Sequence, residues 1–181
     1  NYVEGGLLQI DQGPKDGIIR TEADMAWVKA MIDAGFKFGG KTTIAKDQLW
    51  YGDMIYSDAN GDGNYGDTHD MNFTGTSAQP LYNFGLNFSA SWKGIDFYML
   101  WAGSAGFDLY WYDATYNGTR VKNGYSIATR IADDHYFYDP KNPDDPRTNI
   151  TATYPRITLD STQSNAVTST FYKYKGDYIK L

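Results

Sequence analysis

The sequence contains no cysteine, and it has only two histidines and six prolines among its 181 residues. The absence of cysteine excludes disulfide bonds and thiolate metal sites. No run of about 18 consecutive apolar residues occurs, so a transmembrane helix is not predicted. Lysine and arginine number 16 against 22 aspartates and glutamates, which gives a formal net charge of −6. Nucleic acid is therefore a poor candidate partner, because phosphate contacts need clustered cationic side chains.

Aromatic residues are the most abundant unusual feature, at 17% of the chain and including 16 tyrosines. Tyrosine-rich surfaces are typical of protein interfaces, carbohydrate sites and membrane interfaces. The mean hydropathy is −0.55. This polar average is also compatible with a membrane β-sheet, because such a sheet has one polar face.

The strongest pattern lies in residues 81–104. From Tyr82 to Trp92 every second residue is apolar or aromatic, and the residues between them are small or polar. A period of two predicts a strand with one apolar face and one polar face. The same alternation resumes from Ile95 to Trp101. The pair Lys93-Gly94 between the two runs predicts a tight turn, because glycine readily adopts positive φ.

Each strand of this predicted hairpin is about ten residues long, the length that crosses a bilayer when the strand is tilted. Aromatic residues lie at the ends of the apolar rows, where they suit the two membrane interfaces. The hairpin is therefore predicted to be a membrane hairpin. A long hairpin in a soluble β-sandwich is the alternative, since its polar face would also carry asparagine and serine.

One short helix is predicted over residues 21–34. Thr21 and Asp24 have the spacing of a capping box, in which each side chain accepts a hydrogen bond from the other residue's backbone. The apolar stripe expected from the helical period consists of Trp27, Ala30, Met31 and Ala34. Gly35 is expected to end the helix.

Residues 58–70 predict a calcium loop. Alternate oxygen-bearing side chains at positions 1, 3 and 5 can converge on one hard cation, and Gly63 stands at position 6, where the chain must turn sharply. Position 12 is His69 rather than the usual glutamate, which weakens the match. The candidate ligands are Asp58, Asn60, Asp62, Asn64 through its carbonyl, Asp67 and Asp70. The alternative is a loop held by its own Asx-turn hydrogen bonds, without a metal.

A long aromatic-rich loop is predicted over residues 105–167, and loops of this length usually carry function or disorder. Its exposed rings are candidates for stacking on sugars, although packing of the loop on itself is an equally good interpretation. The candidate ligand-binding residues are Tyr110, Trp111, Tyr112, Tyr136 and Tyr138. Neither histidine has a recognisable nucleophile partner, so no enzymatic activity is predicted.

Four sequence blocks together resemble the C-terminal part of the SusC/RagA-type TonB-dependent outer-membrane transporters. In the order found in that family, the blocks are residues 52–63 (GDMIYSDANGDG), 82–87 (YNFGLN, followed by KGIDF at 93–97), 154–157 (YPRI) and 176–181 (GDYIKL). The resemblance covers roughly residues 52–181. The plug and the TonB-contacting segment of the family have no counterpart in this sequence.

The resemblance implies an all-β fold that is part of a large transmembrane antiparallel β-barrel, with long extracellular loops and one short helix. Residues 1–80 and 105–167 would be extracellular loop regions, 81–104 the membrane hairpin, and 168–181 the start of a further strand. The expected partners are the remainder of the barrel and its plug, outer-membrane lipid, a SusD-like surface lipoprotein, TonB, and an oligosaccharide or peptide substrate.

The function implied by this resemblance is nutrient import, chiefly of glycans, across the outer membrane of a Gram-negative bacterium. The alternative from the residues alone is a soluble, calcium-stabilised β module that binds carbohydrate through surface aromatics. The two differ in what covers the apolar face of the hairpin: lipid in the importer, and protein in the soluble module.

Overall fold

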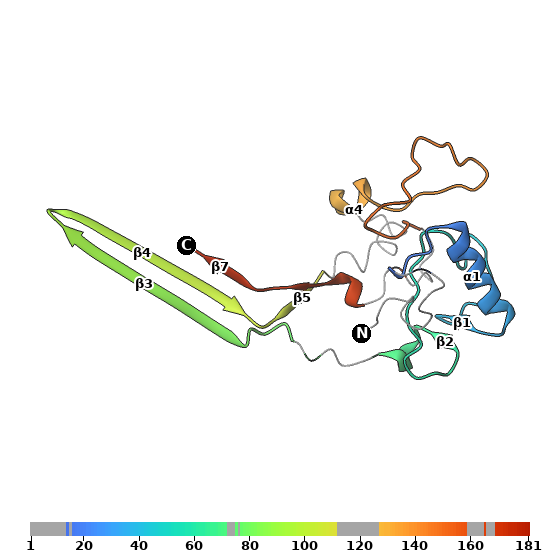
Figure 1. The fold of residues 1–181 in the computed structure, drawn as a ribbon, viewed down its shortest axis with the longest axis horizontal. Coiled ribbons are helices and arrows are strands. Elements are labelled where there is room, and N and C mark those ends of the chain that lie inside the picture. The colour runs from blue at the N-terminus through green and yellow to red at the C-terminus, as the bar shows by residue number, and fades with distance from the viewer. Residues whose placement is uncertain are drawn as a thin grey trace. The chain divides into compact units, whose positions relative to one another are not determined.

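The computed structural model describes residues 14, 16–71, 75, 77–111, 127–158, 165 and 169–181. The chain divides into two compact units (Figure 1). The first unit comprises Asn1–Phe73 and Tyr112–Tyr172, and the second comprises Thr74–Trp111 and Lys173–Leu181. Each unit therefore contains segments from both halves of the sequence.

Helix α1 spans Glu22–Asp33 and confirms the helix that the capping signal predicts. The Asp24 amide donates to the Thr21 hydroxyl at 3.1 Å, and the Thr21 amide donates to the Asp24 carboxylate at 2.9 Å. The buried side chains are Met25, Trp27 and Val28. Of the predicted stripe, Trp27 is buried and Met31 packs half-buried against the core, whereas Ala30 and Ala34 are exposed. The buried face is instead completed by Met25 and Val28, because the neighbouring segments cover that side of the helix.

The first unit contains mostly irregular structure around α1. Its other elements are β1 (Lys37–Phe38), β2 (Asn64–Tyr65), the 3-10 helices η2 (Thr68–Asp70) and η4 (Thr170–Tyr172), and the short helix α4 (Thr129–Asp133). Strands β1 and β2 pair in parallel. No helix among the described residues reaches the length and apolarity that crossing a membrane requires.

An aromatic-rich core connects these pieces. Phe38 packs against Trp27 and Tyr65, with ring centroids 6.0 and 5.0 Å apart. The buried members of this core are Ile19, Met25, Trp27, Val28, Phe38, Leu49, Tyr51, Ile55, Tyr65, Tyr136 and Ala152. Because they come from residues 19–65 and 136–152, the core joins segments that are distant in sequence.

A buried carboxylate fixes the centre of the first unit. Asp53 is fully buried, and it accepts hydrogen bonds from the Arg156 guanidinium, from the Asn165 amide group at 2.9 Å and from the Trp50 backbone amide at 2.7 Å. The Arg156 backbone amide also donates to the Gly52 carbonyl at 2.9 Å. Two of the four sequence blocks, 52–63 and 154–157, therefore meet at this point.

The second unit contains the predicted hairpin. Strand β3 (Tyr82–Trp92) pairs antiparallel with β4 (Ile95–Ala105), in a register that runs from Tyr82 opposite Ala105 to Trp92 opposite Ile95. Lys93 and Gly94 connect the strands with φ values of 48° and 82°. Positive φ at both central residues is the geometry of a type I′ turn, which matches the twist of the flanking strands.

Three shorter strands complete the second unit. Strand β7 (Tyr178–Lys180) pairs with the end of β4, and β5 (Asp108–Tyr110) pairs with β6 (Lys173–Lys175). The predicted start of a further strand in residues 168–181 is therefore two short strands that return to the 77–111 segment.

The predicted fold class is wrong. The described strands do not form part of a large transmembrane antiparallel β-barrel: they lie in three separate sheets of two, three and two strands, and no sheet closes on itself. One pair is parallel, and the first unit is not all-β. The physical reason is that sustained alternation is confined to residues 82–105, whereas the remaining segments are rich in glycine, aspartate and proline, which favour turns over long strands.

Candidate functional site

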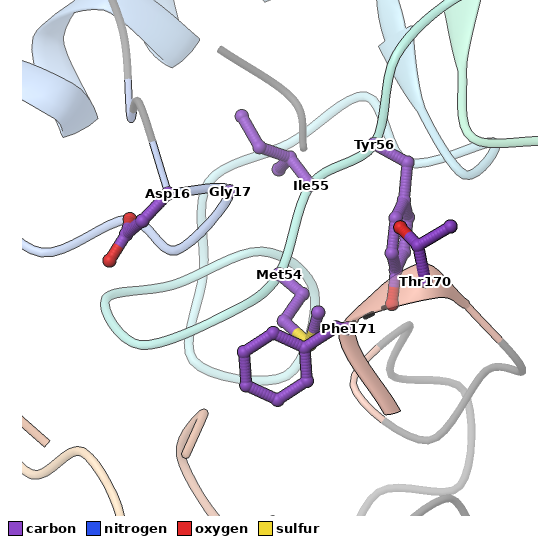
Figure 2. Close-up of a pocket in the computed structure, with 7 residues that line it drawn as sticks. All are labelled: Asp16, Gly17, Met54, Ile55, Tyr56, Thr170 and Phe171. Carbon is purple, nitrogen blue, oxygen red and sulfur yellow. Dashed lines mark hydrogen bonds between the residues drawn. The ribbon is translucent and has the colours of Figure 1, made fainter. Parts of the chain in front are cut away.

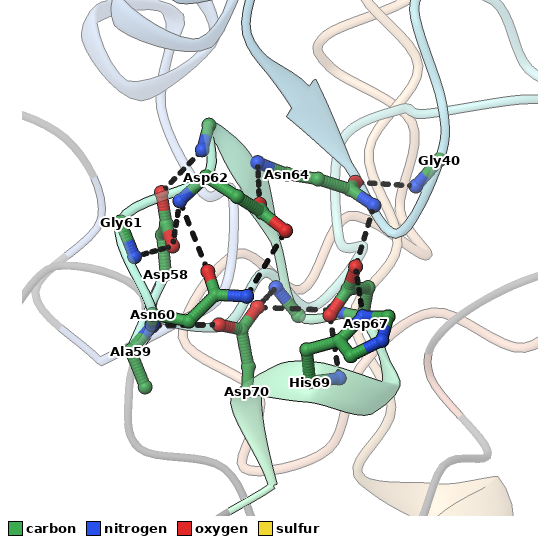
Figure 3. Close-up of polar contacts among 12 residues, drawn as sticks. Gly40, Asp58, Ala59, Asn60, Gly61, Asp62, Asn64, Asp67, His69 and Asp70 are labelled. Carbon is green, nitrogen blue, oxygen red and sulfur yellow. Dashed lines mark hydrogen bonds and ion pairs between the residues drawn. The ribbon is translucent and has the colours of Figure 1, made fainter.

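The loop of residues 58–70 is built around the carboxylate of Asp58 (Figure 3). This carboxylate accepts hydrogen bonds from the backbone amides of Gly61 at 2.6 Å, Asp62 at 3.1 Å and Gly63 at 2.7 Å. Gly61 and Gly63 have φ values of 77° and 83°. The sharp turn that the spacing predicts at Gly63 is confirmed, and glycine makes it possible because it has no Cβ.

The side chains of Asn60 and Asp62 lie on the same turn. The Asn60 amide group donates to the Asp62 carboxylate at 3.0 Å, and the Asp62 backbone amide donates to the Asn60 side-chain oxygen at 3.0 Å. The other Asp62 oxygen accepts from the Asn64 backbone amide at 2.8 Å. The structure thus brings three of the predicted ligands, at positions 1, 3 and 5, into one turn of the chain.

Asp70 has a different place in the loop. It is 1% exposed, and one carboxylate oxygen accepts from the amides of Ala59 at 2.7 Å and Asn60 at 3.3 Å. The other oxygen accepts from the amides of Gly66 at 2.7 Å and Asp67 at 3.1 Å. Asp70 therefore connects the beginning and the end of the loop, and both of its oxygens already accept hydrogen bonds from backbone amides.

The candidate cation site that the structure forms includes His69, the residue that weakens the match to a calcium loop. One ligand atom each from Asp62, Asp67 and His69 lies within 4.8 Å of the others. The His69 ring contacts the Asp67 carboxylate at 3.2 Å, and the His69 amide donates to Asp67 at 2.7 Å. Hydrogen bonds from His69, the backbone one first, lower the pKa of Asp67, and the Asp67 hydrogen bond raises the pKa of His69.

These donors differ in the metals that they suit. Calcium takes oxygen ligands, and Asp58, Asn60 and Asp62 carry them. Both Asp58 oxygens, like those of Asp70, already accept hydrogen bonds from backbone amides. An imidazole such as that of His69 suits zinc, copper or nickel better. The Asn64 side chain, as distinct from the carbonyl that the spacing predicts as a ligand, donates to Asp67 at 3.1 Å and accepts from the Gly40 amide at 2.9 Å.

The predicted sugar-stacking residues fall into separate units. Tyr110 and Trp111 belong to the second unit, where Trp111 packs edge-on against Tyr174 with centroids 6.5 Å apart. Tyr136 and Tyr138 belong to the first unit. Tyr112 lies outside the described residues.

Tyr136 is not available for stacking. It is 1% exposed, and its hydroxyl donates to the Arg20 carbonyl at 2.7 Å. Burial raises the pKa of this hydroxyl, so Tyr136 stays neutral at physiological pH. Tyr138, two residues later, is half-buried and packs edge-on against Tyr51 with centroids 5.2 Å apart. Of these two rings, that of Tyr138 retains surface on which a ligand could stack.

Two cavities of the first unit differ in what they can hold. The cavity of about 10 Å³ between Met54, Tyr56 and Phe171 has room for about one water molecule (Figure 2). A larger cavity of about 160 Å³ lies beside Tyr138. It is lined chiefly by Lys46, Trp50, Tyr51, His135, Tyr138 and Arg156. Sequence reasoning missed Lys46 and Trp50, because no local pattern connects them with residues 135–138.

The hairpin of the second unit exposes a continuous apolar face. The register of β3 and β4 sets Phe84 opposite Gly103, Leu86 opposite Trp101 and Phe88 opposite Met99. The apolar rows of both strands therefore share one face of the sheet. Phe84, Leu86 and Phe88 are 48%, 63% and 49% exposed. The opposite face carries the polar row, in which the Ser104 hydroxyl donates to Asn83 at 2.7 Å.

No protein-family model and no curated protein matches this chain. The geometry of the hairpin, the Asp-rich loop and the larger cavity is therefore the basis for its proposed function.

Proposed function

We propose that this chain serves nutrient uptake, chiefly of glycans, at the outer membrane of a Gram-negative bacterium, and that its β3–β4 hairpin contacts lipid. The exposed apolar face of the hairpin carries the lipid contact. The resemblance of residues 52–181 to SusC/RagA-type transporters carries the nutrient uptake. The proposal concerns membrane contact and uptake, and it does not include the large barrel that the three separate sheets overturn.

The dimensions and chemistry of the hairpin support contact with lipid. A contiguous apolar face is unfavourable in water, and such faces mark membrane or protein interaction sites. The eleven residues of β3 extend about 36 Å at roughly 3.3 Å per residue, enough to cross a hydrocarbon core of about 30 Å when tilted. Tyr82 and Trp92 lie at the two ends of β3, where aromatic residues favour the membrane interfaces.

The further partners of this proposal come from the resemblance to SusC/RagA-type transporters: a SusD-like surface lipoprotein, TonB, and an oligosaccharide or oligopeptide substrate. The direct test is uptake of labelled oligosaccharides and peptides by cells that lack the gene, with and without complementation. Loss of uptake that complementation restores would support the proposal. Unchanged uptake of every glycan and peptide would contradict it.

Paired arginine substitutions on the hairpin test its lipid contact. Phe88 and Ser89 are adjacent and exposed, but their side chains lie on opposite faces of β3. We expect Phe88→Arg to make insertion into lipid vesicles less favourable by about 2–4 kcal/mol if Phe88 lies near mid-bilayer. Ser89→Arg should have a much smaller effect, since its face is polar. Denaturant titration in vesicles measures both, and equal effects would contradict the proposed orientation.

The Asp-rich loop supports a second candidate function, a calcium-stabilised module that binds carbohydrate. The specific observation is the convergence of Asp58, Asn60 and Asp62 on one turn. In this function calcium would make the loop rigid and would take no part in chemistry.

Calcium titration with a nearly isosteric variant tests this candidate. We expect calcium to raise the melting temperature, with a stabilisation of about 2.7 kcal/mol at a concentration 100 times the dissociation constant. Asp62→Asn should weaken this response because it removes a charged ligand, whereas Asp144→Asn, on an exposed turn, should not. Absence of any calcium response would reject the site. A response to zinc alone that His69→Ala abolishes would replace calcium by a transition metal.

A further inference from the structure

The larger cavity of the first unit contains chemistry that neither the hairpin nor the Asp-rich loop uses. Its volume is about 160 Å³, and its walls come from Lys46, Trp50, Tyr51 and residues 135–138 and 156–157. We propose that it binds one anionic sugar ring, such as a uronate residue of an oligosaccharide. The inference rests on the proposed function to the extent that this glycan is the nutrient.

Three aromatic rings form one continuous wall of the cavity. Trp50 packs edge-on against Tyr51 with centroids 5.5 Å apart, and Tyr51 packs edge-on against Tyr138 at 5.2 Å. Trp50 and Tyr138 are half-buried, whereas Tyr51 is 9% exposed. Trp50 and Tyr138 therefore keep ring surface against which the apolar C–H face of a sugar can pack, and Tyr51 holds the two in place.

The same wall carries tyrosine hydroxyls that can form hydrogen bonds with the hydroxyls of a sugar. Within the described residues, no hydrogen bond is formed by the hydroxyl of Tyr51 or of Tyr138, in contrast to the buried hydroxyl of Tyr136. Burial raises the pKa of Tyr51, so its hydroxyl remains a hydrogen-bond donor at neutral pH. Ligand pockets typically combine such a few polar groups with an aromatic lining.

The charged side chains that line the cavity are cations, each with a carboxylate nearby. Its lining includes Lys46 and Arg156 but no carboxylate, although the whole chain has a net charge of −6. The Arg156 charge is compensated by Asp53 at 2.8 Å, and its guanidinium also donates to the Lys46 carbonyl at 3.0 Å. Arg156 thereby positions the segment that carries Lys46. The Lys46 ammonium forms a long ion pair of 4.0 Å with Asp139, and its side chain is 63% exposed, so it can turn from Asp139 to a ligand carboxylate.

The size of the cavity limits the ligand to one ring. Pockets for drug-sized ligands have volumes of about 300–1,000 Å³, well above the 160 Å³ found here. The rest of an oligosaccharide would extend into solvent, so the cavity would recognise one residue of the glycan rather than its whole length.

Calorimetric titration of the full chain with trigalacturonate and with neutral galactotriose tests the inference. We expect the acidic sugar to bind about 1.5- to 5-fold more tightly, as one exposed charge pair allows. Lys46→Gln should abolish that preference, and Lys141→Gln, an exposed lysine outside the cavity, should keep it. Trp50→Ala should weaken binding of both sugars about tenfold or more, since aromatic contact area is lost.

Trp50→Phe provides a variant that keeps a ring if Trp50→Ala does not fold, and it should bind more weakly than the unmodified chain. Equal affinity for both sugars, with no effect of Lys46→Gln, would overturn the preference for an anion. Undetectable binding of both sugars, or binding unchanged in both Trp50 variants, would overturn the site. These measurements are independent of the lipid contact: the Phe88→Arg and Ser89→Arg comparison concerns the second unit and can fail or succeed separately.

Discussion

Replacing Asp53 by alanine is expected to lower the free energy of unfolding by about 3–5 kcal/mol, the usual effect of removing one partner of a buried ion pair. Asp53 is fully buried, and the Arg156 side chain is only 14% exposed, so little water can replace the lost carboxylate. The change would also leave the Asn165 amide group and the Trp50 backbone amide without their acceptor. Because small domains are stable by about 5–15 kcal/mol, the first unit would lose much of its stability.

Urea unfolding followed by circular dichroism measures this loss, and Asp47→Ala is the matched control. Asp47 is an exposed carboxylate in the same segment, so its removal should change stability by about 0.5 kcal/mol or less. The double variant Asp53→Leu with Arg156→Met should cost less than Asp53→Ala alone, since no charge is left uncompensated. An effect of Asp53→Ala no larger than that of Asp47→Ala would contradict this account of the core.

Replacing Gly52 by alanine is expected to destabilise the first unit by roughly 2–5 kcal/mol. Gly52 has a φ of +82°, a conformation that costs other residues about 1–2 kcal/mol. An added Cβ would also lie 2.9 Å from the Arg156 Cβ and closer still to the Tyr136 ring. Tyr136 cannot move away easily, because it is buried and hydrogen-bonded to Arg20. Overpacking of this kind adds about 1–3 kcal/mol.

Gly61→Ala separates the two contributions. Gly61 has a nearly equal φ of +77°, but an added Cβ would meet no atom within 4 Å. It should therefore cost only the backbone contribution of about 1–2 kcal/mol. Thermal and urea unfolding of both variants give the difference. Equal destabilisation would mean that Tyr136 does not pack against Gly52 as described.

Local sequence signals correctly predicted the elements whose partners lie nearby in the chain. The period of two from Tyr82 to Trp101, with Lys93-Gly94 between its halves, predicts the hairpin, because the turn and the alternation together specify the register. Thr21 and Asp24 predict the start of α1 in the same way. The sharp turn of residues 58–63 is determined by aspartate and glycine at fixed spacing, since each Asp58 hydrogen bond reaches no more than five residues.

The tertiary structure decided what these elements are part of. Alternation in two strands does not specify how many further strands pair with them, and for that reason the large barrel was wrong while the hairpin was right. The Asp53–Arg156 pair joins residues 103 apart, and the cavity brings Trp50 beside Tyr138. Such contacts depend on which surfaces meet when distant segments collapse together, and no local period encodes that choice. Burial then assigned Tyr136 to the core and left Tyr138 accessible, although in the sequence the two look alike.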